Sequence, residues 1–467
     1  MTVKLSAREK YCYGIGALGK DLVYALVATY FMVYLTDGLG VSPLFVGGLF
    51  FVARLWDAIN DPLMGWIVDN TKTRFGKFRP WLLIGTLVNS VVLVLLFFNP
   101  GLEGVALYAY IAVTYILWGM TYTVMDIPYW AFIPAMSQDE KERNELSVIP
   151  RVFASIGTFT VASVGLLFVN NVIGDYETGF FYLAVIIAII FILTILVTVS
   201  QVKEQPTTKQ NADTFKFREI FEMLYKNDQL VVLFVTVVLY SIGMYLTTGF
   251  GIYYFKYDLG DENLFSTFTI VAGVAQVLAM LLFPKVAQRF SRRTVFILSC
   301  FLPIIGFFCL YVVGTLFGAN LVYLSLAGVV LFLGFGFSQV LATTMLADAV
   351  DYGEYKLGHR SESIVFSMQP LMVKFSSALQ GLITGIGLTL IGYQENVAQS
   401  AQTLTGMRVM MFVIPSVLVI LSLVVYLKFY RLNGAFYEEV MSTVKKDEVE
   451  PDFSLNQGRI KPQVASR

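Results

Sequence analysis

The sequence predicts an all-α integral membrane protein with twelve transmembrane helices in two six-helix halves. Of its 467 residues, 57% are hydrophobic and only 14% are charged, whereas soluble domains carry about a quarter charged residues. Apolar runs of about 20 residues or more recur along nearly the whole chain, and such a run crosses a hydrocarbon layer of about 30 Å as a helix. A long polar segment divides these runs six and six.

The twelve expected spans have approximate boundaries at residues 12–36, 44–67, 80–99, 105–135, 150–170, 178–200, 229–255, 263–285, 294–314, 319–347, 363–392 and 405–430. The first run is too long for the apolar core of a signal peptide and has no small-residue cleavage site. We therefore expect it to remain in the protein.

The expected domains follow from these spans. Residues 1–200 form an N-terminal six-helix bundle and residues 229–430 a C-terminal one. Residues 201–228 form a cytoplasmic middle loop, in which an apolar face predicts a helix lying on the inner membrane surface. Residues 431–467 form a cytoplasmic tail that begins helix-like, and its polar end is expected to be disordered.

The charges indicate the topology. The 33 basic and 33 acidic residues balance, but among the connections between spans the basic residues fall in every second one. Those after spans two, four, eight and ten carry Lys72, Arg74, Lys77, Arg79, Lys141, Arg143, Arg289, Arg292, Arg293, Lys356 and Arg360. The intervening connections carry none except Lys256. Because positive residues stay on the cytoplasmic side, both termini are predicted to be cytoplasmic.

A faint internal repeat accompanies this pattern. A basic turn follows the second span of each half, at residues 69–79 and 284–293. Two parallel six-span repeats are typical of the major facilitator architecture, in which the substrate site lies at mid-membrane between the halves.

Several charged residues lie inside the predicted spans: Lys20, Asp21, Asp57, Asp61, Asp126, Arg151 and Lys374. A charge at that depth costs roughly 2.5–3.5 kcal/mol on insertion scales, so such side chains usually face the protein interior and line an ion or substrate path. This pattern indicates a carrier.

A cation site is predicted in span two. Asp57 and Asp61 lie one helical turn apart and Asn60 lies between them, so three oxygen-bearing side chains share one face. Hard cations such as sodium prefer clustered oxygens. The alternative is an internal ion-pair network without a bound ion, since neighbouring acids repel unless something neutralises them.

A sugar site is predicted around span four, where Tyr122, Asp126 and Trp130 are spaced four residues apart. Carboxylates accept hydrogen bonds from hydroxyls, and flat rings cover the apolar face of a pyranose. Lys20 and Asp21 join the site from span one and Arg151 from span five. As alternatives, Arg151 reaches the cytoplasmic surface, and Tyr122 and Trp130 are packing residues.

Lys374 is the single charge in the middle of the C-terminal spans. Its expected partner is the acid pair of span two, and that contact would connect the two halves at the site. A lysine that only balances surplus aspartate is the alternative.

Other chemistries find no support in the sequence. Cys12, Cys300 and Cys309 are scattered and odd in number, which predicts neither disulfides nor a metal site. The glycine-rich run at residues 14–21 lacks the Ser or Thr and the preceding strand of a phosphate-binding loop. No nucleophile with a base appears, so we expect neither an enzyme nor a cofactor, and no nucleic-acid partner. The acids of residues 347–355 are interpreted as a gate contact.

Longer stretches resemble a known family. Residues 13–21, 57–65, 74–81, 114–130 and 348–354 are similar to the melibiose permease branch of the glycoside, pentoside and hexuronide cation symporters. The run at residues 115–128 is the most specific, and the likeness extends to about Asn433.

This resemblance implies a bacterial symporter of the cytoplasmic membrane, expected to be a monomer, that takes up an α-galactoside such as melibiose with Na⁺, Li⁺ or H⁺. It implies a cation site at Asp57, Asn60, Asp61 and Thr123. It implies a sugar site at Lys20, Asp21, Tyr122, Asp126, Trp130, Arg151, Gln369 and Lys374.

Three positions depart from the family pattern: Gln339 stands where a pocket tryptophan is expected, Pro370 where a threonine is, and Ala28 where a tyrosine is. Without an aromatic side chain on the wall of the pocket, a different sugar packs well there. A different glycoside or a hexuronide therefore remains an alternative substrate, and a transporter-like sugar sensor without turnover is the alternative function.

Overall fold

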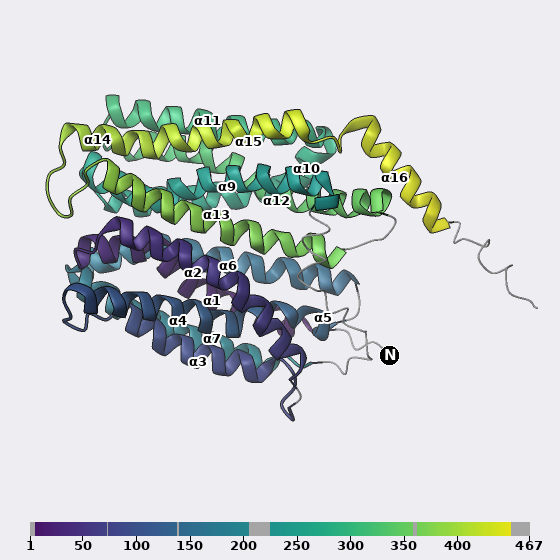
Figure 1. Cartoon of the computed structure of the whole chain (residues 1–467), viewed down its shortest axis with the longest axis horizontal. Helices are drawn as coiled ribbons and strands as arrows, with labels where there is room; N and C mark the ends of the chain where they lie inside the picture. The colour runs from purple at the N-terminus through teal and green to yellow at the C-terminus, as the bar shows by residue number, and fades with distance from the viewer. Residues whose placement is uncertain (1–4, 72, 138–139, 205–224, 358–361, 450–467) are drawn as a thin grey trace, which may run out of the picture.

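The computed structural model describes residues 5–71, 73–137, 140–204, 225–357 and 362–449, and helices make up nearly all of that chain (Figure 1). The N-terminal helices are α1 (Ala7–Val33) with η1 (Tyr34–Gly38), α2 (Pro43–Asp69), α3 (Arg79–Leu96), α4 (Gly104–Ala131), the short α5 (Ile133–Met136), α6 (Glu140–Phe168) with η2 (Val169–Ile173), and α7 (Tyr176–Gln201). The C-terminal helices are α9 (Asp228–Tyr253) with η3 (Tyr254–Asp258), α10 (Asn263–Arg289), α11 (Arg292–Leu316), α12 (Leu321–Leu357), α13 (Glu362–Leu390), α14 (Ala401–Arg408), η4 (Val409–Val413), α15 (Ile414–Phe429) and α16 (Gly434–Val449). The labels η1 to η4 denote π-helical turns.

The twelve predicted spans are confirmed as twelve long helices within the described residues, the last of them built from α14, η4 and α15. Eleven are apolar enough to cross a membrane by length and composition. The twelfth, α2, falls short of that composition because Arg54, Asp57 and Asp61 lie along it.

Some helices continue beyond the apolar runs that predicted them. Span ten was expected to end at residue 347, but α12 continues to Leu357. Its polar extension is held by neighbours: Asp348 pairs with Arg292, and Tyr352 and Lys356 both bond Asp228. Hydropathy marks the width of the apolar layer, whereas side-chain contacts decide where the helix ends. These contacts stay within the C-terminal half, so the predicted gate segment joins α12 to α9 and α11.

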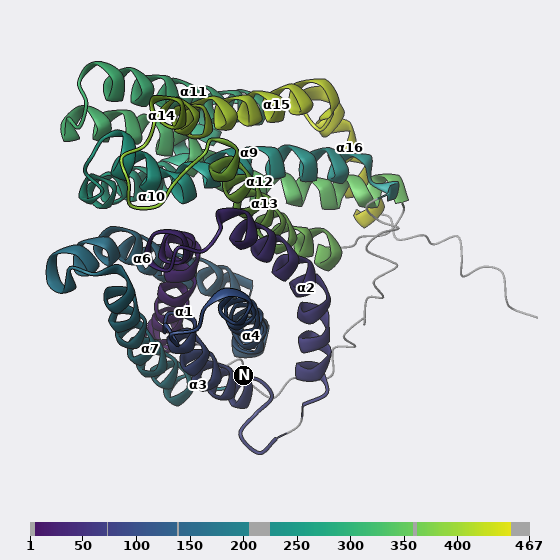
Figure 2. The same ribbon diagram turned by 60° about the vertical axis from the view of Figure 1, so that its left-hand side comes forward.

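The helices form two halves, with α1 to α7 on one side and α9 to α15 on the other (Figures 1 and 2). The halves meet where α2 packs against α13 and α6 against α10. The start of α1 and helix α16 lie at one end of the bundle, which we call the proximal end, and α14 lies at the opposite, distal end (Figure 1).

Residues 205–224, which include most of the predicted surface helix of the middle loop, and residues 450–467 of the tail lie outside the described residues. The tail begins with helix α16, as predicted. The predicted domain boundaries stay predictions.

Reciprocal tyrosine contacts fix α1 against α4 beside the predicted sugar site. The Tyr13 hydroxyl donates to the Tyr129 carbonyl and the Tyr129 hydroxyl to the Tyr13 carbonyl, both at 2.5 Å, and their rings stack 4.5 Å apart. Both side chains are fully buried, so these bonds have no competition from water. They set the register in which Lys20 faces Asp126.

Candidate functional site

Lys20 is the centre of a charged cluster between α1 and α4. Its side chain is 4% exposed, and its ammonium lies 2.9 Å from Asp21 Oδ2 and 3.0 Å from Asp126 Oδ1. The Tyr122 hydroxyl donates to the Lys20 carbonyl at 3.3 Å. A buried ammonium needs such partners, because an unpaired charge in the interior costs several kcal/mol.

Aromatic rings complete this cluster. The Lys20 ammonium lies 4.9 Å from the centre of the Trp130 ring and 5.6 Å from that of Tyr129, distances at which a cation is attracted to a ring face. The carboxylates of Asp21 and Asp126 stay about one fifth exposed. They can therefore accept hydrogen bonds from a hydroxylated ligand while Lys20 holds them in place.

The acids of α2 each face a cation of the protein itself. Asp57 is buried, and its Oδ2 lies 2.7 Å from Arg54 Nη1. Asp61 accepts a hydrogen bond from Thr123 at 3.0 Å and pairs with Lys374. The amide nitrogen of Asn60 is buried without a hydrogen-bond partner in the described part of the chain. The carboxylates are thus neutralised by residues on α2 and α13.

The Lys374–Asp61 pair joins the two halves, since α13 belongs to one and α2 to the other. This is the partner that charge balance predicts for Lys374. Both side chains are partly exposed, at 28% and 21%, so water or an ion from solution can reach them. A partly exposed pair exchanges partners more readily than a buried one, because less desolvation is at stake.

The remaining predicted residues lie apart from these contacts. Gln369 donates to the Thr343 hydroxyl at 3.1 Å, and Thr343 donates to the Gln339 carbonyl at 3.4 Å. Arg151 is exposed on α6 and forms no ion pair with another described residue. The structure therefore brings together Lys20, Asp21, Tyr122, Asp126 and Trp130 in one group, and Asp61, Thr123 and Lys374 in a second.

Sequence reasoning missed Arg54 and Tyr24. Arg54 lies one turn before Asp57 and pairs with it, and its guanidinium carbon lies 5.9 Å from the centre of the Tyr24 ring. The spacing of three residues on one helix was a usable signal for this pair. Tyr24 packs against both Trp118 and Tyr122, so it connects the α2 acids to the aromatic side of the sugar cluster.

Removal of the Arg54 charge is expected to destabilise the protein. Arg54→Met leaves Asp57 buried without its partner, which costs about 3–5 kcal/mol for a buried pair. Thermal unfolding of the purified variant should occur at a lower temperature, and high NaCl should restore stability if Na⁺ replaces the guanidinium at Asp57. Arg151→Met, which removes an exposed arginine, is the control. Equal unfolding temperatures for the two variants would show that the pair adds nothing.

The fold and the placement of these charges define a membrane transporter whose charged groups lie among the helices of the N-terminal half, with one ion pair joining that half to the other. Residues 12–434 match the family described as MFS/sugar transport protein. The chain belongs to this family, and it is a sugar symporter of the major facilitator type and not an enzyme.

Relatives transport several glycosides. The chain is 31% identical over 428 residues to the isoprimeverose transporter of Lactiplantibacillus pentosus, covering 91% of this chain and 88% of the relative. It is 30% identical to a lactose permease of Leuconostoc lactis (94% and 72%). It is 29% identical to the raffinose carrier protein of Pediococcus pentosaceus (93% and 71%).

Solved structures show the same fold. The partially occluded inward open conformation of the xylose transporter XylE from E. coli aligns with a TM-score of 0.61 at 15% identity, covering 91% of this chain and 97% of XylE. The nucleoside transporter NupG aligns with a TM-score of 0.63 at 14% identity, covering 91% and 99%. The predicted major facilitator fold of twelve helices is confirmed.

Proposed function

We propose that this symporter takes up one glycoside, an α-galactoside such as melibiose, together with one monovalent cation, Na⁺, Li⁺ or H⁺, by alternating access. The proposal places it in a bacterial cytoplasmic membrane with both termini inside, because the basic connections lie at the proximal end. Lactose and raffinose, named for two relatives, both contain a galactosyl group. This supports a galactoside over a hexuronide.

The sugar is proposed to bind at the Lys20 cluster. Asp21 and Asp126 accept hydrogen bonds from its hydroxyls, Trp130 and Tyr122 cover its apolar face, and Lys20 fixes the carboxylates. A hydrogen bond to a charged group contributes about 1.5–3 kcal/mol, so two carboxylates can select stereochemistry. Neither Gln369 nor Arg151 contacts this cluster in the present conformation. Gln369 lies in the other half and completes the site only if the halves move, whereas Arg151 lies in the same half and completes it only if its own side chain turns toward the cluster.

The observation that carries the coupling is the Lys374–Asp61 ion pair. We propose that the transported cation and the Lys374 ammonium compete for Asp61. When the cation binds among Asp57, Asn60, Asp61 and Thr123, Lys374 is released and its ammonium can donate to the sugar. When the cation leaves, Lys374 returns to Asp61 and the sugar loses a donor. Cation and sugar then strengthen each other's binding, and by linkage the effect is reciprocal.

Uptake by purified protein in proteoliposomes tests this function. Each sugar of a panel is added outside the vesicles, and the panel contains α- and β-galactosides, other glycosides and hexuronides. For at least one combination of sugar and cation, the inward sugar gradient should drive Na⁺, Li⁺ or H⁺ into the vesicles. Binding of a sugar without any cation uptake would instead indicate a sensor without turnover. Uptake driven by a hexuronide alone would remove the galactoside assignment.

A further inference from the structure

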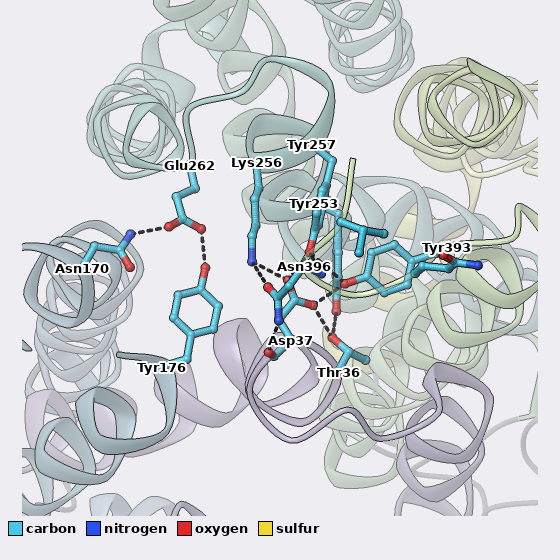
Figure 3. Close-up of polar contacts among 12 residues, drawn as sticks. Thr36, Asp37, Asn170, Tyr176, Tyr253, Lys256, Tyr257, Glu262, Tyr393 and Asn396 are labelled. Atoms are coloured by element: carbon cyan, nitrogen blue, oxygen red, sulfur yellow. Dashed lines mark hydrogen bonds and ion pairs between the residues drawn. The ribbon is translucent and has the colours of Figure 1, made fainter. Parts of the chain in front are cut away.

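Lys256 breaks the charge pattern of the sequence, and the structure shows what it contacts. Its ammonium lies 2.6 Å from Asp37 Oδ2 and 3.1 Å from Asn396 Oδ1 at the distal end (Figure 3). Asp37 belongs to the N-terminal half, whereas Lys256 and Asn396 belong to the C-terminal half. The exceptional lysine thus joins the halves.

Asp37 is the acceptor at the centre of this contact. Its side chain is fully buried, and it accepts hydrogen bonds from Thr36 at 2.8 Å, from Tyr257 at 2.6 Å and from Tyr393 (Figure 3). Burial, together with the nearby Asp37 charge, raises the pKa of the Tyr393 hydroxyl well above its usual range, so this phenol remains a donor. Loss of the carboxylate would leave several buried donors without an acceptor at once.

A second arm of contacts lies beside Lys256, toward η2 and α7. Glu262 accepts a hydrogen bond from Asn170 at 2.7 Å and one from Tyr176. The ring of Tyr176 lies 4.6 Å from the Lys256 ammonium, which connects the two arms (Figure 3). Asn170 and Tyr176 come from the N-terminal half and Glu262 from the C-terminal half.

Rare backbone geometry supports both arms. Of the described π-helical turns, η1 carries Thr36 and Asp37, η2 carries Asn170, and η3 carries Lys256 and Tyr257. The turn η1 ends α1 and the turn η3 ends α9, and these are the first helices of the two halves. The two turns therefore face each other across the interface. Single π-helical turns are uncommon and frequently lie at functional sites.

We infer that η1 and η3 form a latch, centred on Asp37 and Lys256, that closes the distal end of the transporter and must open to admit sugar from that side. The inference rests on the proposed function, since it assumes a site that opens alternately. The bidentate contact of Arg408 with Asp258 lies entirely inside the C-terminal half. It therefore stays formed on opening, and the contacts that break are those between η1 and η3.

A separate observation places the closure at the same end. The backbones of α2 and α13 approach closely at Gly47 and Gly385: a Cβ added to Gly385 would lie 2.9 Å from Gly47 Cα, and one added to Gly47 would lie 3.0 Å from Gly385 Cα. Side chains cannot fit at such distances. A larger residue there would hold the halves apart without removing any bond of the latch.

The test measures access to the site from each side of the membrane. Ala28→Cys serves as reporter, because Ala28 is exposed on α1 two turns nearer to the distal end than Asp21. The native Cys12, Cys300 and Cys309 are free thiols and are replaced by alanine.

An impermeant maleimide added to the distal side should label the reporter slowly. With Asp37→Asn, and separately with Gly385→Val, labelling from that side should be about tenfold faster, which corresponds to a shift of about 1.4 kcal/mol in the open–closed equilibrium.

Asp258→Asn is the matched control, since Asp258 is equally buried and ion-paired at the same end but within one half. Because this pair is formed in both the open and the closed state, its loss should leave the labelling rate unchanged. If Asp37→Asn proves unstable, Tyr393→Phe removes one donor without unpairing the acid and should give a smaller increase. Labelling rates in Asp37→Asn, Tyr393→Phe and Gly385→Val that match the control would overturn the latch. Because labelling needs neither sugar nor cation, this result is independent of the uptake assay, and failed uptake alone would count against the proposed function instead.

Discussion

Asp126→Ala is expected to abolish measurable sugar binding. Asp126 is one of the two carboxylates that hold the Lys20 ammonium, and its partly exposed side chain can accept hydroxyl hydrogen bonds. Two charge-assisted hydrogen bonds of about 1.5 kcal/mol each correspond to about a 100-fold loss of affinity. Without Asp126, the ammonium also draws Asp21 toward itself and away from the ligand. Isothermal titration of the purified variant checks this.

Asp258→Asn is a suitable control for Asp126→Ala, because it removes a carboxylate from an ion pair at the distal end. It should bind sugar like the unchanged protein. Comparable thermal unfolding of both variants would show that any loss of binding is local. An unaffected binding isotherm for Asp126→Ala would remove this residue from the sugar site.

Lys374→Met is expected to abolish cation-driven accumulation while the protein still binds cation. Without the ammonium, Asp61 has no competing partner on α13, so the transported cation should bind more tightly and leave more slowly. Coupling free energies of about 1–3 kcal/mol correspond to about 5–150-fold, and accumulation should fall at least about tenfold. Uptake into proteoliposomes under an imposed Na⁺ gradient gives the accumulation, and titration gives the cation affinity.

Lys374→Arg retains the charge and should keep part of the coupling. If Lys374→Met still accumulates sugar in response to cations, the lysine only balances surplus aspartate. Asp61→Asn removes the acceptor instead, so Lys374 is released even without a cation. Sugar binding in the absence of cation should become tighter, and the response to cations should be lost.

The fold could be predicted from the sequence because the membrane imposes simple rules. Apolar length predicted each span, and charge balance predicted Lys374 beside the α2 acids. The pairing of Arg54 with Asp57 could also have been read from their spacing.

The distal latch could not be predicted from local pattern. Asp37 and Lys256 lie more than 200 residues apart in the chain and come together across the interface between the halves. Each was expected in a connection, and the π-helical turns that carry them extend spans one and seven beyond their apolar runs. The sequence showed Lys256 as an exception to the charge pattern, but only the fold shows its partner.

Cation dependence of sugar binding tests the central claim most directly. The dissociation constant of an α-galactoside should be measured on purified protein in Na⁺, in Li⁺, and in choline at low and high proton concentration. Competition between the cation and Lys374 for Asp61 predicts that at least one cation tightens sugar binding about fivefold or more, and that Lys374→Met removes this response. Equal affinity in all four conditions would contradict the account.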